Sequence, residues 1–383
     1  MKNNHIVKIS KLKTTSHIME SLSKLADDIF PAPINIIFSS HAEMKLAEWV
    51  LMFHEKGFNT LVYPSHPSSI SSKTVDYLQQ NKIKYIPRVS DNLLPDDLEM
   101  IKSFSPHLIF DDGAVLIDYC ADNRKDFPQL IGAIEFTTTG SNTLKKYEDD
   151  SSCFPIFDVG DSYCKHKLCN GPGTGFSTLI TIFNLVNINL AGKNVLIIGY
   201  GEVGKGVAKS FSQNGSNIIV WDNSVENLVA AYFNGYKPDP EKMLLNKADI
   251  VVTCSGDINV FGKDELSTVK DEVIIANVGC FSSEIDFKLI EENSIHHDIS
   301  DNHVDTFTLK NGKKITILSK GNLVNISSGN GWPIEQIDLN FAVSTLCFQE
   351  LLSKKEHYSG LCKVPQDLEQ KALETFLKEK VSY

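Results

Sequence analysis

The sequence lacks long apolar segments and basic runs. No stretch reaches the ~18 consecutive apolar residues of a membrane-spanning helix, and the polar N-terminus has neither the apolar stretch nor the cleavage site of a signal peptide. The formal net charge is −11 at pH 7. An acidic chain without a basic patch is a poor candidate for binding nucleic acid or an anionic membrane. We therefore expect a cytoplasmic protein whose partner is a small molecule.

Paired cysteine motifs are also absent. The eight cysteines are scattered, with no Cys-x-x-Cys pair, which argues against a zinc site and against a disulfide framework. Cys164 and Cys169 form the one close pair, and two thiolates alone do not complete the coordination of a metal ion. We predict reduced thiols and no metal site.

Short apolar segments alternate with segments of helical periodicity along most of the chain. The 383 residues suggest about two domains. The predicted strands are residues 34–38, 60–63, 108–110, 194–198, 217–220, 249–253 and 273–277, and the predicted helices are residues 41–56, 68–80, 176–191, 203–214, 337–352 and 364–383. Strands that alternate with helices indicate an α/β protein with parallel sheets.

A glycine-rich loop follows the predicted strand 194–198 and precedes a predicted helix. It reads Gly199-Tyr200-Gly201-Glu202-Val203-Gly204, the Gly-x-Gly-x-x-Gly pattern of a Rossmann dinucleotide site. The first glycine permits the tight turn, the second lets the backbone approach a pyrophosphate, and the third lets helix and strand pack closely. The N-terminus of the helix then offers free N–H groups to the phosphates.

Asp222 ends the next predicted strand, 23 residues after Gly199. A carboxylate there accepts the adenosine-ribose hydroxyls of NAD and repels the additional phosphate of NADP. No arginine lies beside it. The loop and Asp222 together predict NAD as the cofactor. The alternative is a glycine-rich turn in an α/β core that binds nothing.

Longer motifs around this loop resemble the cofactor domain of the S-adenosylhomocysteine hydrolase (adenosylhomocysteinase) family. They are AGKNVLIIGYGEVGKGVAKSF, NGYKP, VVTCSGDINVFG, IIANVGCFSSEID and KGNLVNISSGNGWP. FDDGAVL, EFTTTGSNTLKK and DVGDSYCKHKLCNGPG resemble motifs of the family's substrate domain. The similarity runs from about His41 to Leu377.

The resemblance implies a reaction and assigns residues to it. In the family, NAD oxidises the 3′-hydroxyl of a nucleoside, the 5′ thioether is eliminated, water adds, and the hydride returns. His41 and Asp112 match acid/base groups, and Lys165 matches the lysine beside the 3′-hydroxyl. Asn170 matches a substrate-binding asparagine. The matched cofactor contacts outside the glycine loop are Thr137, Thr138, Thr139, Asn227, Ser255, Asn277 and Asn325.

Several family positions carry different residues here. Phe136 replaces a glutamate that binds the ribose hydroxyls, and Cys169 replaces an aspartate. Glu43 replaces a threonine, while Cys280 and Trp332 replace histidines. The family's C-terminal extension has no clear counterpart. These changes predict a rebuilt substrate pocket, to which Glu43, Phe136 and Trp332 contribute, and weak binding of an ordinary nucleoside.

The predicted architecture is a substrate domain and a Rossmann NAD-binding domain, each α/β with a parallel sheet. Residues 1–175 form the substrate domain, completed by residues 330–360, residues 176–329 form the NAD-binding domain, and residues 361–383 form a C-terminal helical tail. The resemblance implies a homo-oligomer, a dimer or a tetramer.

Three functions compete at this point. The first is an adenosylhomocysteinase-like enzyme that oxidises a secondary hydroxyl of a substrate related to a nucleoside or thioether. The second is a non-catalytic NAD-binding relative that regulates a partner. The third is a 2-hydroxyacid-type dehydrogenase, because the fold alone does not fix the function. The third needs an arginine for the substrate carboxylate, and Arg88 and Arg124 lie in no dehydrogenase motif.

Overall fold

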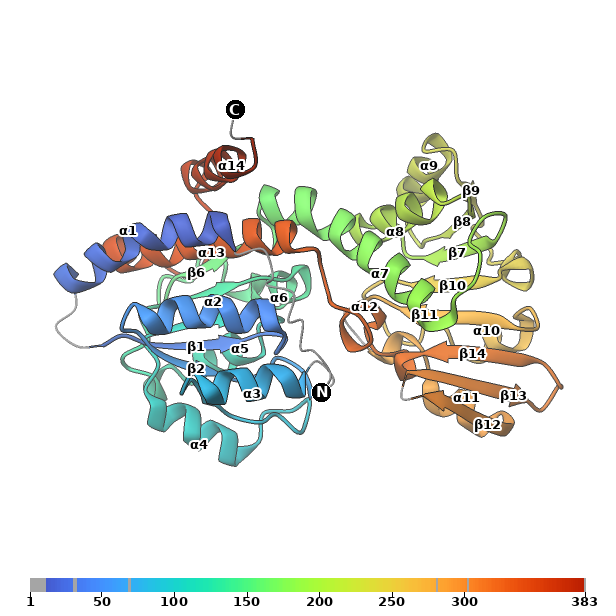
Figure 1. The fold of residues 1–383 in the computed structure, drawn as a ribbon, viewed down its shortest axis with the longest axis horizontal. Helices are drawn as coiled ribbons and strands as arrows, with labels where there is room; N and C mark the ends of the chain where they lie inside the picture. Colours follow the sequence, from blue (N-terminus) through green and yellow to red (C-terminus); the bar gives the residue numbers. More distant parts are fainter. Residues whose placement is uncertain (1–11, 30–32, 68–69, 280–281, 302, 382–383) are drawn as a thin grey trace, which may run out of the picture. The chain divides into compact units, whose positions relative to one another are not determined.

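A computed structural model describes residues 12–29, 33–67, 70–279, 282–301 and 303–381. The chain forms two compact units (Figure 1). Unit 1 comprises Met1–Cys169 and Ile334–Tyr383, and unit 2 comprises Asn170–Pro333.

Unit 1 is built on a parallel sheet in the order β15-β6-β5-β4-β1-β2-β3. The strands are β1 (Asn35–Ser39), β2 (Asn59–Val62), β3 (Lys84–Tyr85), β4 (Leu108–Asp111), β5 (Gly132–Glu135), β6 (Ile156–Asp158) and β15 (Leu361–Lys363). Every strand pair of this sheet is parallel. β4, β5 and β6 are buried at every position, because helices cover both faces of a parallel sheet.

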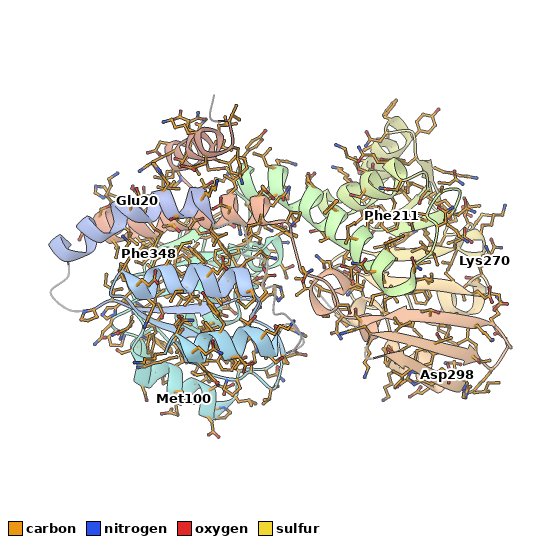
Figure 2. All side chains as sticks on the ribbon, in the orientation of Figure 1. Glu20, Met100, Phe211, Lys270, Asp298 and Phe348 are labelled. Carbon is orange, nitrogen blue, oxygen red and sulfur yellow. The ribbon has the colours of Figure 1, made fainter. Side chains whose placement is uncertain are left out.

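The helices of unit 1 surround this sheet. They are α1 (Lys13–Ile29), α2 (Met44–Glu55), α3 (Ser72–Gln80), α4 (Pro95–Phe104), α5 (Val115–Asp122), α6 (Thr138–Leu144), α13 (Ile334–Lys354) and α14 (Gln366–Lys380). α1 and α14 pack on α13. Trp49 of α2 stacks on Phe341 of α13, with ring centroids 4.1 Å apart. Phe348 of α13, labelled in Figure 2, is fully buried. The long helix α13 thus returns from unit 2 to close the core of unit 1.

The C-terminal segment, expected as a helical tail over residues 361–383, contains helix α14 and is grouped with unit 1. β15 pairs in parallel with β6, and α14 contacts both α13 and α1. A three-residue strand carries too little periodicity to be read from the sequence, so its pairing was not predicted.

Unit 2 contains a sheet in the order β12-β13-β14-β11-β10-β7-β8-β9. The strands are β7 (Asn194–Ile198), β8 (Asn217–Trp221), β9 (Lys237–Pro238), β10 (Ile250–Thr253), β11 (Val273–Asn277), β12 (Ser294–Asp301), β13 (Val304–Leu309) and β14 (Lys314–Leu318). From β9 to β14 the order is that of a Rossmann fold. β13 pairs antiparallel with β12 and β14, an addition that the sequence reading did not include.

The helices of unit 2 are α7 (Gly171–Val186), α8 (Glu202–Gln213), α9 (Val225–Phe233), α10 (Lys263–Thr268), α11 (Phe287–Glu292) and α12 (Val324–Ser327). α7 begins earlier than the predicted residue 176, and it packs closely on α8. A Cβ on Gly175 would lie 2.2 Å from the carbonyl oxygen of Gly206, so glycines permit this approach. Phe211 of α8 is fully buried (Figure 2). Among the helices described, none is both long enough and apolar enough to cross a bilayer.

Candidate functional site

The glycine loop of unit 2 lies where the strand order of its sheet reverses. β7 is flanked by β8 on one side and β10 on the other, and open α/β sheets bind ligands at such a point, in a crevice at the carboxyl ends of the strands. Gly199 follows β7 with φ +97°, and a Cβ on it would lie 2.7 Å from Cα of Ser255. Only glycine fits this turn against the loop after β10.

Gly201 and Gly204 face different surroundings. A Cβ on Gly201 would meet nothing within 4 Å, whereas a Cβ on Gly204 would lie 2.0 Å from the carbonyl oxygen of Gly199. Gly201 therefore borders open space, as the approach of a pyrophosphate requires, and Gly204 permits the close packing of helix and strand. Glu202 and Val203 open α8, whose first N–H groups lack partners within the helix.

Asp222 lies directly after β8, beside the glycine loop. Its Oδ2 accepts a hydrogen bond from Tyr200 N at 2.6 Å, and its Oδ1 accepts one from Ser224 N at 2.7 Å. Each oxygen keeps a second acceptor site for a ribose hydroxyl. Asn227, in the first turn of α9, donates its backbone N–H to Ser224 Oγ at 3.2 Å. It therefore belongs to the same turn as Asp222.

Asn277 and Ser255 are held by a hydrogen-bond network behind the crevice. Asn277 is fully buried; its Oδ1 accepts from Thr253 Oγ1 at 3.0 Å and from Gly279 N at 2.7 Å, and its Nδ2 donates to Gly321 O at 3.0 Å. The Asn277 amide is thus bonded to three segments of the chain and holds them together.

Glu284 holds Ser255 in place and was not predicted from the sequence. Its Oε2 accepts from Ser255 N and Oγ at 3.1 and 3.2 Å, and its Oε1 accepts from Gly256 N at 2.8 Å. Burial raises the pKa of Glu284, and these hydrogen bonds oppose that shift.

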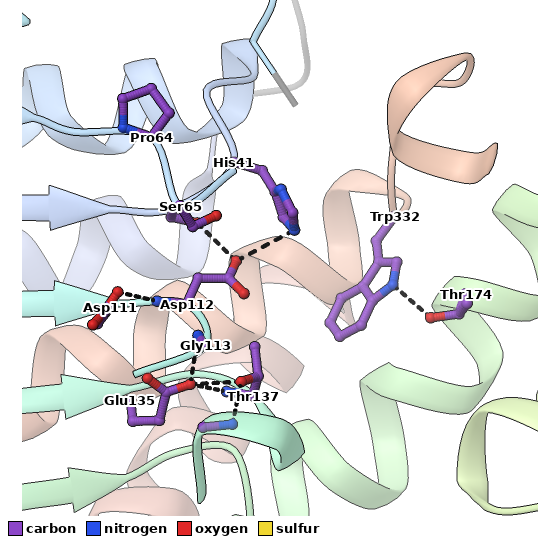
Figure 3. Close-up of polar contacts among 12 residues, drawn as sticks. His41, Pro64, Ser65, Asp111, Asp112, Gly113, Glu135, Thr137, Thr174 and Trp332 are labelled. Atoms are coloured by element: carbon purple, nitrogen blue, oxygen red, sulfur yellow. Dashed lines mark hydrogen bonds and ion pairs between the residues drawn. The ribbon is translucent and has the colours of Figure 1, made fainter. Parts of the chain in front are cut away.

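Asn325 presents an unsatisfied group in unit 2. It is 2% exposed, its Nδ2 donates to Ser177 Oγ at 3.1 Å, and its buried Oδ1 has no hydrogen-bond partner. A buried acceptor without a partner costs about 1–3 kcal/mol, so this oxygen fits a donor from a ligand. Trp332 belongs to unit 2 as well. Its Nε1 donates to Thr174 Oγ1 at 2.8 Å (Figure 3).

A second site lies in unit 1, also at the point where the strand order reverses. β1 is flanked by β2 and β4, and His41 follows β1 while Asp112 follows β4. His41 Nε2 lies 3.7 Å from Asp112 Oδ2 (Figure 3). The same oxygen accepts a hydrogen bond from Ser40 Oγ at 3.0 Å. His41 Nδ1 is buried without a partner. The sequence placed these residues 71 positions apart, and the fold brings them together.

Glu43 lies beside this pair at the start of α2. Its Oε2 contacts Lys45 Nζ at 2.8 Å, and the Glu43 side chain is 25% exposed. Burial raises the pKa of Glu43, while the Lys45 ammonium and then His41 oppose the rise. Lys45 is 7% exposed and was not singled out from the sequence, because a lysine in the first turn of a helix reads as a solvent-facing residue.

The threonines of the TTT motif begin α6. Thr137 caps the helix, since its Oγ1 accepts from Gly140 N at 2.9 Å, and Thr138 and Thr139 form the first turn. Glu135 lies immediately before them. It is fully buried, and its Oε1 accepts from Thr137 Oγ1 at 2.6 Å (Figure 3). Burial, and then the Asp111 carboxyl, raise the pKa of Glu135.

Phe136 and Cys169, the two replacements at the predicted ribose site, are both buried. Phe136 is 4% exposed and stacks on Phe110, with ring centroids 6.1 Å apart. The ring centroid of Trp49 lies 5.9 Å from that of Phe136. Cys169 is 1% exposed, and burial raises the pKa of its thiol to about 12. The structure places Phe136 mainly in the aromatic core, which leaves it only an edge for a substrate. Cys280 lies outside the described residues.

Lys165 lies on a π-helical segment, Cys164–Asn170. Such segments are rare and are frequently found at functional sites. Lys165 is 6% exposed and its backbone N–H donates to Ser162 Oγ at 3.2 Å. Asn170 ends the segment and is partly exposed. The Lys165 ammonium lowers the pKa of Asp158, although burial, the larger effect, raises it.

Fold and site together define a two-unit α/β protein with a dinucleotide-binding Rossmann unit and a separate unit that carries acid/base side chains. A family model described as S-adenosyl-L-homocysteine hydrolase, NAD binding domain, matches residues 176–331. The chain is 31% identical over 357 residues to an adenosylhomocysteinase of Thermotoga maritima, covering 91% of this chain and 88% of that relative. An adenosylhomocysteinase of Thermoplasma volcanium is 30% identical over 352 residues, covering 90% and 86%.

A relative of another name is also similar. An S-inosyl-L-homocysteine hydrolase of Methanopyrus kandleri is 34% identical over 289 residues, covering 74% of this chain and 68% of that relative. The chain belongs to the adenosylhomocysteinase family, and its cofactor is NAD. The predicted family membership, fold class and cofactor are thereby confirmed. The open space over Gly201, the position of Asp222 and the unpaired Asn325 oxygen fit a bound dinucleotide.

Proposed function

We propose that the protein hydrolyses the thioether bond between homocysteine and a nucleoside through transient oxidation of a ribose hydroxyl. The observation that carries this proposal is the His41–Asp112 pair at the switch point of unit 1 (Figure 3). A buried polar group without a partner destabilises the fold. His41 Nδ1 is such a group, and a non-catalytic relative would gain nothing from keeping it.

His41 and Asp112 would move the protons of the elimination and hydration steps. The thioether leaves as a thiolate that must take up a proton, and the water that replaces it must lose one. The imidazole Nε2 and the carboxylate Oδ2 lie 3.7 Å apart, so a proton would pass between them through one water molecule, and the group that donates in one step could accept in the next.

Lys165 would accept the proton of the ribose hydroxyl during oxidation. The lysine is 6% exposed, and its amine, when unprotonated, can accept a proton from a hydroxyl beside it. NAD, when bound, accepts the hydride from the sugar carbon and later returns it. Asp222, Asn325 and the glycine loop would hold it in place.

The nucleoside is expected to differ from that of a typical member. Phe136 provides no acceptor for the ribose hydroxyls, and the Glu43–Lys45 ion pair lines the start of α2 near His41. Binding of S-adenosylhomocysteine should therefore be weak. The name of the Methanopyrus kandleri relative makes S-inosylhomocysteine, in which a base oxygen replaces the amine, a second substrate to test. Association into a homo-oligomer stays a prediction.

The test is incubation of the purified protein, loaded with NAD, with each of these two thioethers, followed by mass spectrometry for homocysteine and for the released nucleoside. We expect homocysteine release from at least one of them, and its loss in Asp112→Asn. If neither thioether yields homocysteine while NAD remains bound, the hydrolase proposal is wrong for these substrates and the regulatory alternative gains support.

A further inference from the structure

The buried carboxylate of Glu135 occupies a position between two loops of unit 1. Glu135 ends β5 and is opposite Asp111 in the register of β4 and β5. The loop after β4 carries Asp112, and the loop after β5 carries the threonines of α6. Glu135 is 0% exposed, so its contacts are entirely with the protein.

One side of the carboxylate fixes the loop that carries Asp112. Oε1 accepts a hydrogen bond from Gly113 N at 3.0 Å, and Oε2 accepts one from Ala114 N at 2.9 Å. Gly113 and Ala114 have φ of +106° and +61°, a left-handed conformation that is unfavourable for alanine. Successive backbone N–H groups in such a turn form a concave site for an anion. The Glu135 carboxylate is that anion.

The other side fixes the loop after β5. Oε1 also accepts from Thr137 N at 2.8 Å and from Thr137 Oγ1 at 2.6 Å (Figure 3). Gly140 lies against the carboxylate so closely that a Cβ there would be 2.2 Å from Oε1. Glu135 thus accepts from four donors, the N–H groups of Gly113, Ala114 and Thr137 and the Thr137 hydroxyl. The bonds from Thr137 and Gly113 oppose the rise in the pKa of Glu135 that burial and Asp111 cause.

We infer that Glu135 is a positioning residue that sets Asp112 relative to the threonines of α6, and that its two oxygens, by accepting the N–H groups of Gly113 and Ala114, hold the left-handed turn there. The inference rests on the proposed function only for its effect on turnover. Glutamine has the same shape but only one acceptor oxygen, so Glu135→Gln must leave the N–H of Ala114, or the donors of Gly113 and Thr137, facing an amide group. The turn then loses its anion, and Asp112 loses its fixed orientation toward His41.

Asp338 offers a matched control in the same unit. It is 1% exposed, and its carboxylate accepts from Thr14 N at 3.0 Å, Thr15 N at 2.9 Å and Thr15 Oγ1 at 2.9 Å. It therefore makes the same kinds of bond as Glu135, but to the start of α1 and not to the Asp112 loop. Asp338→Asn measures what loss of such a carboxylate does to unit 1 in general.

The experiment measures hydrogen exchange and steady-state kinetics in the full chain loaded with NAD. In Glu135→Gln, the amides of Gly113, Ala114 and Thr137 should exchange about tenfold faster than in Asp338→Asn. The kcat for homocysteine release should fall by about 10–100-fold, as expected for a misplaced catalytic group. KM should change by less than about threefold. Should Glu135→Gln not fold, Glu135→Asp keeps the carboxylate on a shorter side chain. Effects between those of Asp338→Asn and those predicted for Glu135→Gln are then expected.

Unchanged exchange at these three amides, or a kcat equal to that of Asp338→Asn, would overturn the inference. The exchange measurement needs no substrate. If the wild-type protein releases no homocysteine at all, the proposed function fails, and the exchange result alone decides whether Glu135 holds the two loops.

Discussion

His41 Nε2 and Asp112 Oδ2 lie 3.7 Å apart, at the carboxyl ends of two adjacent parallel strands between which the strand order of unit 1 reverses. The glycine loop and Ser255 occupy the equivalent place in unit 2. Each unit thus presents its functional side chains at its own switch point, where the divergence of the connecting loops leaves room for a ligand.

Replacement of Asp112 tests the acid/base pair. We expect Asp112→Asn to lower kcat for homocysteine release by about 10²–10⁴-fold, because the amide cannot accept or relay a proton. NAD content should be unchanged, since Asp112 is not among the residues proposed to hold NAD. Both quantities can be measured on one preparation, by steady-state kinetics and by release of the cofactor in acid. A variant with wild-type kcat would remove Asp112 from the mechanism.

The glycines of the cofactor loop allow a paired test. Gly201→Ala adds a methyl group to open space, whereas Gly204→Ala places one 2.0 Å from the Gly199 carbonyl oxygen. We expect Gly201→Ala to retain the stability of the cofactor-free protein and to bind NAD at least about tenfold more weakly, a loss of ~1.4 kcal/mol.

Gly204→Ala should instead lower the free energy of unfolding itself, by roughly 1–3 kcal/mol. Urea unfolding and calorimetric titration with NAD separate the two effects. Equal NAD affinity of Gly201→Ala and wild type would contradict the placement of the pyrophosphate.

Phe136 is expected to stabilise unit 1. Its ring stacks on Phe110 and packs near Trp49, so Phe136→Ala should lower the free energy of unfolding by about 3–5 kcal/mol. Chemical denaturation of the cofactor-free protein measures this. A cost below about 1 kcal/mol, the range of surface substitutions, would show that the ring is not part of the core and would return it to the substrate pocket.

The pH dependence of stability tests the surroundings of Glu43. Its pKa in the folded protein is raised above the ordinary value of 4.5, chiefly by burial. The folded state then holds this proton more tightly than the unfolded state, so the contribution to stability is present below about pH 4.5 and declines as pH rises through the folded pKa. Wild type should lose stability relative to Glu43→Gln as pH rises from 4 toward 7.

The ion pair with Lys45 makes the opposite prediction. If the 2.8 Å contact dominated over burial, the pKa of Glu43 would be lowered, and wild type would gain stability relative to Glu43→Gln over this pH range. Urea unfolding of both proteins at several pH values distinguishes the two signs.

The sequence carries strong local signals for the cofactor unit. The buried strand, the glycines and Asp222 lie within one stretch of chain. Gly199 and Gly204 have steric reasons to be glycine, whereas Gly201 borders open space. The strand β15 and the antiparallel β12–β13–β14 segment were not predicted. A three-residue strand is too short to show a period. The alternation of strands and helices predicts parallel pairing, so it does not indicate the antiparallel strands at the end of the sheet.

The site in unit 1 was predictable in part. His41 and Asp112 were found through family motifs, but neither periodicity nor spacing indicates that they meet. Glu135 and Glu284 escaped notice because acidic residues near strand ends read as turn residues. Lys45 escaped notice because lysines are rarely buried. The functions of all three depend on hydrogen bonds and burial that only the folded chain creates.

The most direct test of the proposed reaction is hydrolysis in heavy water. Oxidation of the ribose hydroxyl makes the neighbouring carbon–hydrogen bond acidic, so elimination removes that proton, and the addition of water places a solvent proton on the same carbon. We predict that the released nucleoside, analysed by mass spectrometry, carries a deuterium at this carbon. Homocysteine release with an unlabelled nucleoside would mean that water displaces the thioether directly, and would contradict the account.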